Sequence, residues 1–386
     1  GSEMCIRDRS GLLDTDPWQR DEPAWTVASP KRVMFASAIV GTIDQAMLTV
    51  MKAKHAWMRH VALSRHLLIV DEVHASDPYM TEVVSSLVKR HVSVGGHALL
   101  MSATLGEVLR AQLMDRKRLP FSEACTVRYP SVNHVEVPTP NSRSSISITR
   151  YPSALARVIT CVRNGGCALI IRSTVSSAIQ TYLELEAEGL PVLLHHSRFA
   201  DTDRQELDRR LLSIIGKRGT REPVAIVATQ TCEQSLDIDA DLLISDPAPA
   251  DVLLQRRGRL GRHRPEMTLP MVILAPEKLE ETAKAQLILL NMRPAKMPKG
   301  SEWAYVYDVL ATTATIEWLD NRSEIRIPED VREWVEVATH PEHVSALALR
   351  MGWQELFGAS RGGAGKLKQV ASNVLIDWSI PYLSLI

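Results

Sequence analysis

Short apolar runs alternate along the chain with segments whose apolar residues recur at helical spacing. The apolar runs predict strands at 66–70, 97–101, 168–171, 192–194, 224–228, 242–244 and 270–274. The helical spacing predicts helices at 44–60, 79–92, 152–162, 176–187 and 203–213. Because strands that alternate with helices are typical of βαβ units, the sequence predicts an α/β fold with a mostly parallel sheet.

Two changes of pattern divide the chain. A Pro-rich stretch at 129–145, YPSVNHVEVPTPNSRSS, predicts a linker or an edge segment. After about residue 276 the pattern turns helical, as in EKLEETAKAQLILLNM and PEDVREWVEVA. We therefore expect a non-native or disordered lead-in, a first sheet domain, a second one and a helical region, with the respective limits 1–30, 31–130, 146–276 and 277–386.

Polar residues follow five of the predicted strands directly. These tails read DEVH after residue 70, SAT after 101, RST after 171, HHSR after 194 and TQ after 228. Solvation of strand ends explains any one tail, but it explains five with this chemistry poorly. Open parallel sheets bind ligands beyond the carboxyl ends of their strands, so we expect a binding edge there.

Composition narrows the class of protein. Lys+Arg and Asp+Glu both number 45, so any basic groove for nucleic acid has to be local. No apolar run approaches the ~20 residues that span a bilayer, and we expect no membrane partner. The five cysteines fit no common zinc pattern, and their odd number argues against a disulfide framework. These features predict a cytoplasmic protein with reduced thiols.

Two stretches carry residue types suited to phosphate chemistry. In DEVH, one carboxylate can hold magnesium and the next can orient or deprotonate an attacking water. Alone this tetrapeptide is a weak signal. In QRRGRLGR (255–262), arginines on a Gly-containing turn can direct their planar, positively charged guanidinium groups at one anion. A basic surface turn or a plain contact to a phosphate backbone is the alternative interpretation, but the specific Q-R-x-G-R-x-G-R spacing argues against it.

Together these stretches resemble a known family. DEVH, SAT (102–104), ATQTCEQSLDID (228–239) and QRRGRLGR occur in the order seen in superfamily 2 helicases. Further stretches resemble the CRISPR-associated helicase–nuclease of type I systems, namely VGTIDQAML (40–48), KHAWMRHVALSRHLLIVDEVHASDPYM (54–80), HHSRF (195–199) and IRIPEDVREWVE (326–337). The likeness covers about 33–345, and Ser76 departs from it where the family often has an aromatic residue. It implies RecA-like parallel-sheet helicase domains, the first incomplete and the second complete, followed by a helical C-terminal region.

The resemblance implies ATP and magnesium as cofactors and assigns roles in catalysis. Asp71 would coordinate magnesium, and Glu72 would be the hydrolytic base. Arg259 and Arg262 would be arginine fingers, and Asp237 would contact the ribose. We expect the acidic pair and the arginine pair to face each other over a shared nucleotide cleft.

The resemblance also assigns coupling and nucleic-acid contacts. His74 would meet Gln255 across the cleft, while Ser102 and Thr104 would couple nucleotide state to strand movement. The nucleic-acid backbone would contact Thr42, Arg172, Ser173, Ser197 and Thr229. Hydroxyls at strand ends position phosphates without reading bases, so binding should be sequence-tolerant and salt-sensitive.

The phosphate-binding loop of such enzymes has no match in the chain. The pattern G-x-x-x-x-G-K-[ST] is absent, and GGAGKLK (362–368) lacks its first glycine and its hydroxyl residue. We interpret GGAGKLK as a flexible basic loop. No His-Asp dipeptide marks a nuclease site, so the nuclease domain is expected upstream or on a separate chain. The chain is therefore expected to be a fragment that neither binds ATP tightly nor hydrolyses it.

The favoured hypothesis is a fragment of an ATP-dependent single-stranded DNA translocase of CRISPR interference, recruited by a guide-RNA surveillance complex. Its substrate and partner come from the resemblance alone. A DExH helicase acting on RNA is one alternative, because the sequence does not show whether a 2′-hydroxyl is tolerated. A nucleic-acid- or partner-binding module without ATPase activity is the other.

Overall fold

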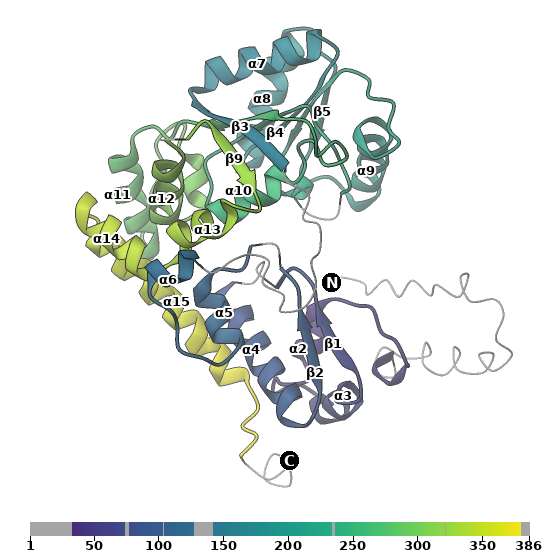
Figure 1. Ribbon diagram of the computed structural model, residues 1–386, viewed down its shortest axis with the longest axis vertical. Helices are drawn as coiled ribbons and strands as arrows, with labels where there is room; N and C mark the ends of the chain where they lie inside the picture. The colour runs from purple at the N-terminus through teal and green to yellow at the C-terminus, as the bar shows by residue number, and fades with distance from the viewer. Residues whose placement is uncertain are drawn as a thin grey trace, which may run out of the picture. The chain divides into compact units, whose positions relative to one another are not determined.

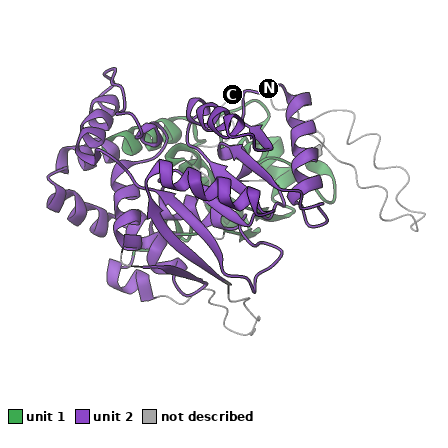
Figure 2. Cartoon of the chain, turned by 90° about the horizontal axis from the view of Figure 1, so that it is seen from above, with its two compact units in different colours: residues 1–105, 109–118, 362–386 green, residues 106–108, 119–361 purple. Residues whose placement is uncertain are grey.

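The computed structural model describes residues 33–73, 77–102, 104–126, 142–233, 236–320 and 322–379. The chain forms two compact units (Figure 2). Unit 1 comprises residues 1–105, 109–118 and 362–386, and unit 2 comprises residues 106–108 and 119–361. No pattern in the sequence pointed to the grouping of 362–386 with the N-terminal part.

Unit 1 is built on two parallel strands joined by a helical crossover (Figure 1). Strand β1 (Leu67–Val70) pairs with β2 (His97–Leu100), and α4 (Pro78–Ser93) connects them. Asp77 caps α4, because its side chain accepts a hydrogen bond from the Met80 amide at 2.8 Å. The remaining elements of this unit are η3 (Val33–Phe35), α2 (Ile43–Met47), α3 (Ala56–Leu63) and most of α5 (Glu107–Leu113).

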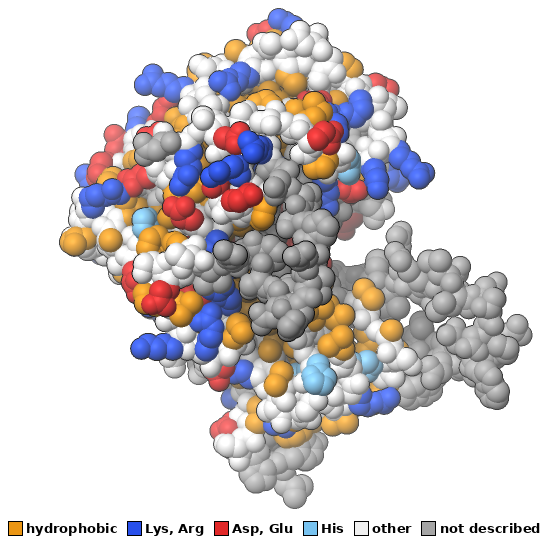
Figure 3. Space-filling model, viewed as in Figure 1, with side chains coloured by type: hydrophobic (Ala, Val, Ile, Leu, Met, Phe, Trp, Pro, Cys, Tyr) orange, Lys and Arg blue, Asp and Glu red, His pale blue; other side chains and the backbone are white. Residues whose placement is uncertain are grey.

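The two faces of this small sheet differ in burial. Leu68 and Val70 are buried with the apolar face of α4. Leu67 and Ile69, which alternate with them, are 57% and 53% exposed. Parallel sheets are normally covered on both faces, whereas the described part of unit 1 covers one face of this sheet. Hydrophobic side chains accordingly appear on the surface of unit 1 in Figure 3.

The helix predicted over 44–60 is interrupted. It forms α2 and α3, with His55 in the left-handed region at φ 65° just before α3. Between the two helices the Lys52 amide donates to the Val374 carbonyl at 2.7 Å, and the Ile376 amide donates to the Val50 carbonyl at 2.9 Å. The prediction of one helix was wrong because these backbone groups pair with a segment more than 300 residues away.

Unit 2 contains a larger sheet with the strand order β5-β6-β4-β7-β8-β3-β9. Its strands are β3 (Ser142–Thr149), β4 (Cys167–Ile171), β5 (Val192–His195), β6 (Val224–Ala228), β7 (Leu242–Ser245), β8 (Leu269–Leu274) and β9 (Glu324–Ile327). All pairs are parallel except β3 with β9. Every strand predicted from an apolar run is confirmed, including the two in unit 1.

Two strands of this sheet were not predicted. Strand β3 overlaps the stretch expected to be a linker or an edge segment, yet it pairs with β8 on one side and with β9 on the other. The linker prediction was therefore wrong from residue 142 onward. Strand β9 lies in the region whose pattern had predicted helices.

Helices cover both faces of the larger sheet (Figure 1). One face packs against α7 (Tyr151–Arg163) and α8 (Val175–Ala187). The other face packs against α9 (Asp201–Ile215), α10 (Ala250–Arg257) and α13 (Val331–Thr339). Because β4, β6 and β7 are buried along their whole length, their sequences are continuous apolar runs.

The predicted helical character of the C-terminal region is confirmed. Its elements are α11 (Leu279–Leu290), η6 (Glu302–Tyr305), α12 (Val309–Asp320), α13, α14 (Pro341–Met351) and α15 (Gln354–Val374); the short α6 (Phe121–Thr126) packs on α13. Trp303 and Trp334 are fully buried, and the Trp318 ring stacks on Trp334 at 5.5 Å between centroids. Trp303 and Trp334 are therefore core residues of the helical region. No helix among the described residues is long and apolar enough to cross a membrane.

The GGAGKLK segment is helical. Residues 362–368 lie inside α15, so the prediction of a flexible loop was wrong. A Cβ atom added at Gly362 or Gly365 would meet nothing within 4 Å. The segment therefore forms an ordinary exposed turn of helix and contains no phosphate-binding loop.

Candidate functional site

The acidic pair lies directly after β1 in unit 1. Asp71 and Glu72 are both exposed, and Asp71 Oδ1 accepts a hydrogen bond from the Glu72 amide at 2.9 Å. Glu72 adopts a left-handed backbone at φ 53°, which is uncommon for a residue other than glycine. An accessible carboxylate at a strand end suits Mg²⁺, which keeps several waters and takes only one or two protein carboxylates. His74 lies outside the described residues.

The coupling residues follow β2 in the same unit. The Thr104 amide donates to Ser102 Oγ at 3.2 Å, and the Thr104 side chain is buried. Thr42 is exposed and immediately precedes α2. The hydroxyl of Thr104 has no hydrogen-bond partner within the described ranges.

Three of the predicted nucleic-acid contacts follow neighbouring strands of unit 2. Arg172 follows β4, Thr229 follows β6 and Ser197 follows β5, and these strands are adjacent in the order β5-β6-β4. The backbone connects them further, because the Arg172 amide donates to Ala228 at 2.8 Å and the Thr229 amide donates to His195 at 3.1 Å. Ser197 is exposed, whereas Thr229 is buried.

The Arg172 side chain interacts with other residues of unit 2. Its Nε lies 2.9 Å from Asp246 Oδ1, and its guanidinium stands over the Tyr151 ring at 4.8 Å. Asp246 Oδ2 also accepts the Ser173 amide at 2.7 Å, and Ser173 is buried. Asp246 was missed by the sequence analysis, although it follows β7 just as the predicted residues follow their strands.

The QRRGRLGR stretch begins in α10 and ends in the turn after it. Gly261 has φ +60°, and a Cβ there would lie 3.1 Å from Leu269 Cδ1, so the turn requires glycine. Arg259 is buried, and its Nε and Nη2 donate to the carbonyls of Cys232 and Glu233 at 3.2 and 2.6 Å. Gln255 is half-buried on α10. The turn is thus bonded to the TQTCEQ segment.

The second arginine of the turn is more accessible. Arg262 is 43% exposed, and its Nε lies 2.6 Å from Asp237 Oδ1. The same carboxylate oxygen contacts His263 Nε2 at 3.0 Å. The hydrogen bond from His263 and the charge of Arg262 lower the pKa of Asp237. The expected ribose contact and the expected finger therefore lie side by side, and His263 joins them without having been predicted.

Arg256 and Glu233 were also missed. Arg256 is fully buried, and its Nε donates to Glu233 Oε1 at 2.8 Å. It shares the inward face of α10 with Leu253, three positions earlier. An arginine at helical spacing from buried leucines is the signal that could have revealed it.

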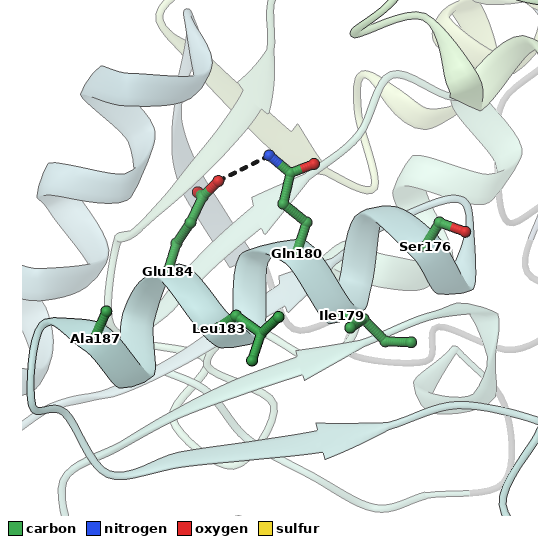
Figure 4. A pocket seen from close by; sticks show the side chains of 6 residues that line it. All are labelled: Ser176, Ile179, Gln180, Leu183, Glu184 and Ala187. Carbon is green, nitrogen blue, oxygen red and sulfur yellow. Dashed lines mark hydrogen bonds between the residues drawn. The ribbon is translucent and has the colours of Figure 1, made fainter.

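The pocket drawn in Figure 4 lies apart from these residues. It is a shallow surface depression along the outward side of α8 (Figure 4), lined by Ser176, Ile179, Gln180, Leu183, Glu184 and Ala187. None of the predicted site residues lines it. Gln180 Nε2 donates a hydrogen bond to Glu184 Oε1 across one helical turn at 2.8 Å, so this pair stabilises α8.

Comparison with known proteins gives consistent matches. Residues 164–265 match the family model "CRISPR-associated nuclease/helicase Cas3, C-terminal". A CRISPR-associated endonuclease/helicase Cas3 of Escherichia coli K12 is 35% identical over 268 residues, which are 62% of this chain and 30% of that protein. The crystal structure of T. fusca Cas3-AMPPNP superposes with a TM-score of 0.74 and 29% identity, covering 91% of this chain and 43% of that one. A chain of a CRISPR RNA-guided surveillance complex, pre-nicking, has a TM-score of 0.67 and 27% identity, with 90% and 45% covered.

The fold matches Cas3 structures with RecA-like α/β domains, which confirms the predicted fold class. The resemblance stated from the sequence is confirmed as well, because the chain is similar to CRISPR-associated helicases named Cas3 in sequence and in structure. The chain spans about a third of the length of the curated relatives, from 30% to 38% for the first three.

Proposed function

We propose that the chain is the motor part of a CRISPR-associated helicase that uses ATP to move along single-stranded DNA. Its relatives include a structure with AMPPNP and a guide-RNA surveillance complex, which support a nucleotide cofactor and such a complex as the partner. The observation that carries the proposal is the presence, in one Cas3-related chain, of an accessible acidic pair after β1 and an arginine pair after α10.

The proposed chemistry divides between the two units. Asp71 would hold magnesium, which would supply positive charge beside the phosphates. Glu72 would take the proton of the attacking water, and Arg259 and Arg262 would stabilise the charge on the transferring phosphoryl group. Because Asp237 pairs with Arg262, it would orient that arginine as well as contact the ribose. His74 and Gln255 would connect the two halves.

The proposed nucleic-acid path runs along the strand ends. Ser197 offers an exposed hydroxyl, and Thr42 offers another in unit 1. Arg172, Ser173 and Thr229 are buried or nearly so, and they would form the floor that holds the exposed contacts in place. Ser102 and Thr104 would transmit the nucleotide state to this path.

A chimaera tests the motor function. In it, this chain replaces the matching part of the Escherichia coli relative, whose remainder supplies the length that this chain does not span. We expect ATP hydrolysis that single-stranded DNA stimulates more than matched RNA does. Glu72→Gln should lower kcat by at least ~100-fold because it removes the base. Arg262→Ala should lower kcat by about 1000-fold because it removes a guanidinium that stabilises the charge on the transferring phosphoryl group.

The matched control is Glu123→Gln on α6, an exposed glutamate with the same change of charge. It should leave ATP hydrolysis unchanged. A chimaera that hydrolyses ATP equally well with Glu72→Gln contradicts the assignment of the base. Stimulation by RNA alone would favour the alternative of an RNA helicase.

A binding module without ATPase activity is the second candidate. It is favoured by the absence of a G-x-x-x-x-G-K-[ST] match in the 386 residues. Under this hypothesis the chain binds oligonucleotides, while the chimaera shows no hydrolysis that depends on Glu72.

A further inference from the structure

Helix α10 carries one arginine that is completely enclosed by unit 2. Arg256 has no exposed surface, although it lies next to the accessible turn that holds Arg262. Burying an isolated charge is costly, so a buried guanidinium requires partners for its N–H groups. The hydrogen-bond partners of Arg256 lie in separate segments of unit 2, which the guanidinium therefore links.

The guanidinium of Arg256 contacts three different segments. Its Nε and Nη2 lie 2.8 and 2.7 Å from Glu233 Oε1, in the TQTCEQ segment after β6. Its Nη1 donates to Ser245 Oγ at 2.8 Å and to the Asp246 carbonyl at 3.1 Å, at the end of β7. Its Nη2 also donates to the Tyr307 hydroxyl at 2.7 Å, in the helical region.

One side of this cluster leads to a proposed arginine finger. The Glu233 carboxylate binds Arg256, while the Glu233 carbonyl accepts Arg259 Nη2 at 2.6 Å. Cys232, one residue earlier, accepts Arg259 Nε at 3.2 Å. Glu233 therefore links Arg256, through its side chain, to Arg259, through its backbone carbonyl.

The other side leads to the strand ends assigned to nucleic acid. Asp246 gives its carbonyl to Arg256, and its carboxylate binds the Ser173 amide and Arg172 Nε at 2.7 and 2.9 Å. Gln230 adds a parallel connection, because its Nε2 donates to the Ser173 carbonyl at 3.1 Å and to the Tyr307 hydroxyl at 3.4 Å. The cluster thus connects both ends without passing through solvent.

We propose that Arg256 is a positioning residue that couples Arg172 and Ser173, the buried floor beneath the nucleic-acid contacts, to the placement of Arg259. The inference rests on the proposed function and adds a route by which a bound strand changes the arginine finger. A planar guanidinium can donate hydrogen bonds to Glu233, Ser245 and Tyr307 at once, whereas a lysine ammonium is a compact point charge that cannot reach all three. Buried hydrogen-bonded networks of this kind have few alternative arrangements, which suits a coupling device.

Two conservative variants of adjacent residues test the role. Arg256→Lys keeps the charge and removes the planar guanidinium. Arg257→Lys is the matched control, because Arg257 bonds instead to Ser144 Oγ at 3.0 Å, within β3. The probe is a fluorescein-labelled oligothymidylate, and the readouts are its affinity by anisotropy and the Arg259 Nε–H resonance by NMR. Thermal unfolding reports whether each variant is folded.

In the wild-type chain, adding the oligothymidylate should shift the Arg259 Nε–H resonance. In Arg256→Lys that response should disappear while the protein stays folded, and affinity should fall by about tenfold, equivalent to ~1.4 kcal/mol. Arg257→Lys should retain both the response and the affinity. If Arg256→Lys unfolds, Tyr307→Phe removes one contact of the cluster and should weaken the response instead.

Two results would overturn the inference in different ways. A response that persists in folded Arg256→Lys, or in Tyr307→Phe when the lysine variant unfolds, means that Arg256 only stabilises the fold. A wild-type chain that does not bind the oligothymidylate at all removes the proposed function and this inference with it.

Discussion

His60 shows how a single buried side chain makes the stability of unit 1 depend on pH. The His60 side chain is buried, and the centroid of its ring lies 4.7 Å from that of the Trp378 ring. Its Nε2 accepts a hydrogen bond from Arg90 Nε at 3.3 Å. Burial, and then the positive charges of Arg90 and His91, lower the pKa of His60 below its ordinary 6.5. The unfolded chain therefore takes up a proton that the folded chain does not. Stability present above about pH 6.5 is lost as the pH falls.

We predict that His60→Gln reduces this loss. Glutamine does not titrate, and its carbonyl can still accept the Arg90 hydrogen bond. Urea unfolding measured from about pH 7 to about pH 5 should show a smaller fall in the free energy of unfolding for the variant than for the wild type. The exposed His97→Gln serves as the control and should follow the wild type. Identical profiles for His60→Gln and wild type would exclude His60 as the source.

Helix α15 offers a prediction at the scale of one element. Gly362 and Gly365 lie in its interior and are exposed, with open space around both. A glycine in an exposed helix interior costs up to about 1 kcal/mol relative to alanine. Gly362→Ala and Gly365→Ala should each raise the free energy of unfolding by roughly that amount, measured by denaturant unfolding.

Gly106, in contrast to Gly362 and Gly365, has no space for a Cβ atom. A Cβ at Gly106 would lie 2.7 Å from Thr339 Oγ1 on α13, so Gly106→Ala should destabilise the protein. If Gly362→Ala and Gly365→Ala also destabilise, then the segment is not the open helix described above.

The elements also show which features a sequence predicts well. Strands β4, β6 and β7 could be predicted because burial on both faces makes each a continuous apolar run. Strand β3, with the sequence SRSSISIT, could not, because its partners are fixed by β8 and β9 far along the chain. The break in the helix predicted over 44–60 likewise depends on backbone pairing with residues 374–376, which no local window contains.

For the candidate site, the sequence motifs pointed to exposed residues and to some buried ones, but they missed Arg256 and Asp246. Asp71 and Arg262 follow from patterns of charged residues, and both are exposed where a ligand could reach them. Arg256 and Asp246 were missed because their importance comes from burial and from each other, at 3.1 Å between Nη1 and the carbonyl oxygen. Such pairing depends on tertiary contacts that spacing in the sequence does not encode.

At the scale of the molecule, one face of the sheet in unit 1 is not covered by the residues that the structure describes, which departs from the usual packing of α/β proteins. Leu67, Ile69 and Leu99 expose about half of their surfaces on neighbouring parallel strands, at 57%, 53% and 47%. Exposed apolar patches and open sheet edges promote association between molecules. The larger sheet of unit 2 has helices on both faces and carries no such liability there.

We therefore predict that the chain associates through this face as its concentration rises. The double variant Leu67→Thr, Ile69→Thr should reduce association in light scattering while changing the free energy of unfolding by no more than about 0.5 kcal/mol, since both side chains are already exposed. Leu68→Thr on the same strand is the matched control; Leu68 is buried, so this change should cost at least ~2 kcal/mol. A double variant that destabilises the chain as much as Leu68→Thr would mean that this face is covered in solution. If the double variant and the wild type associate equally, the molecules associate through a different surface.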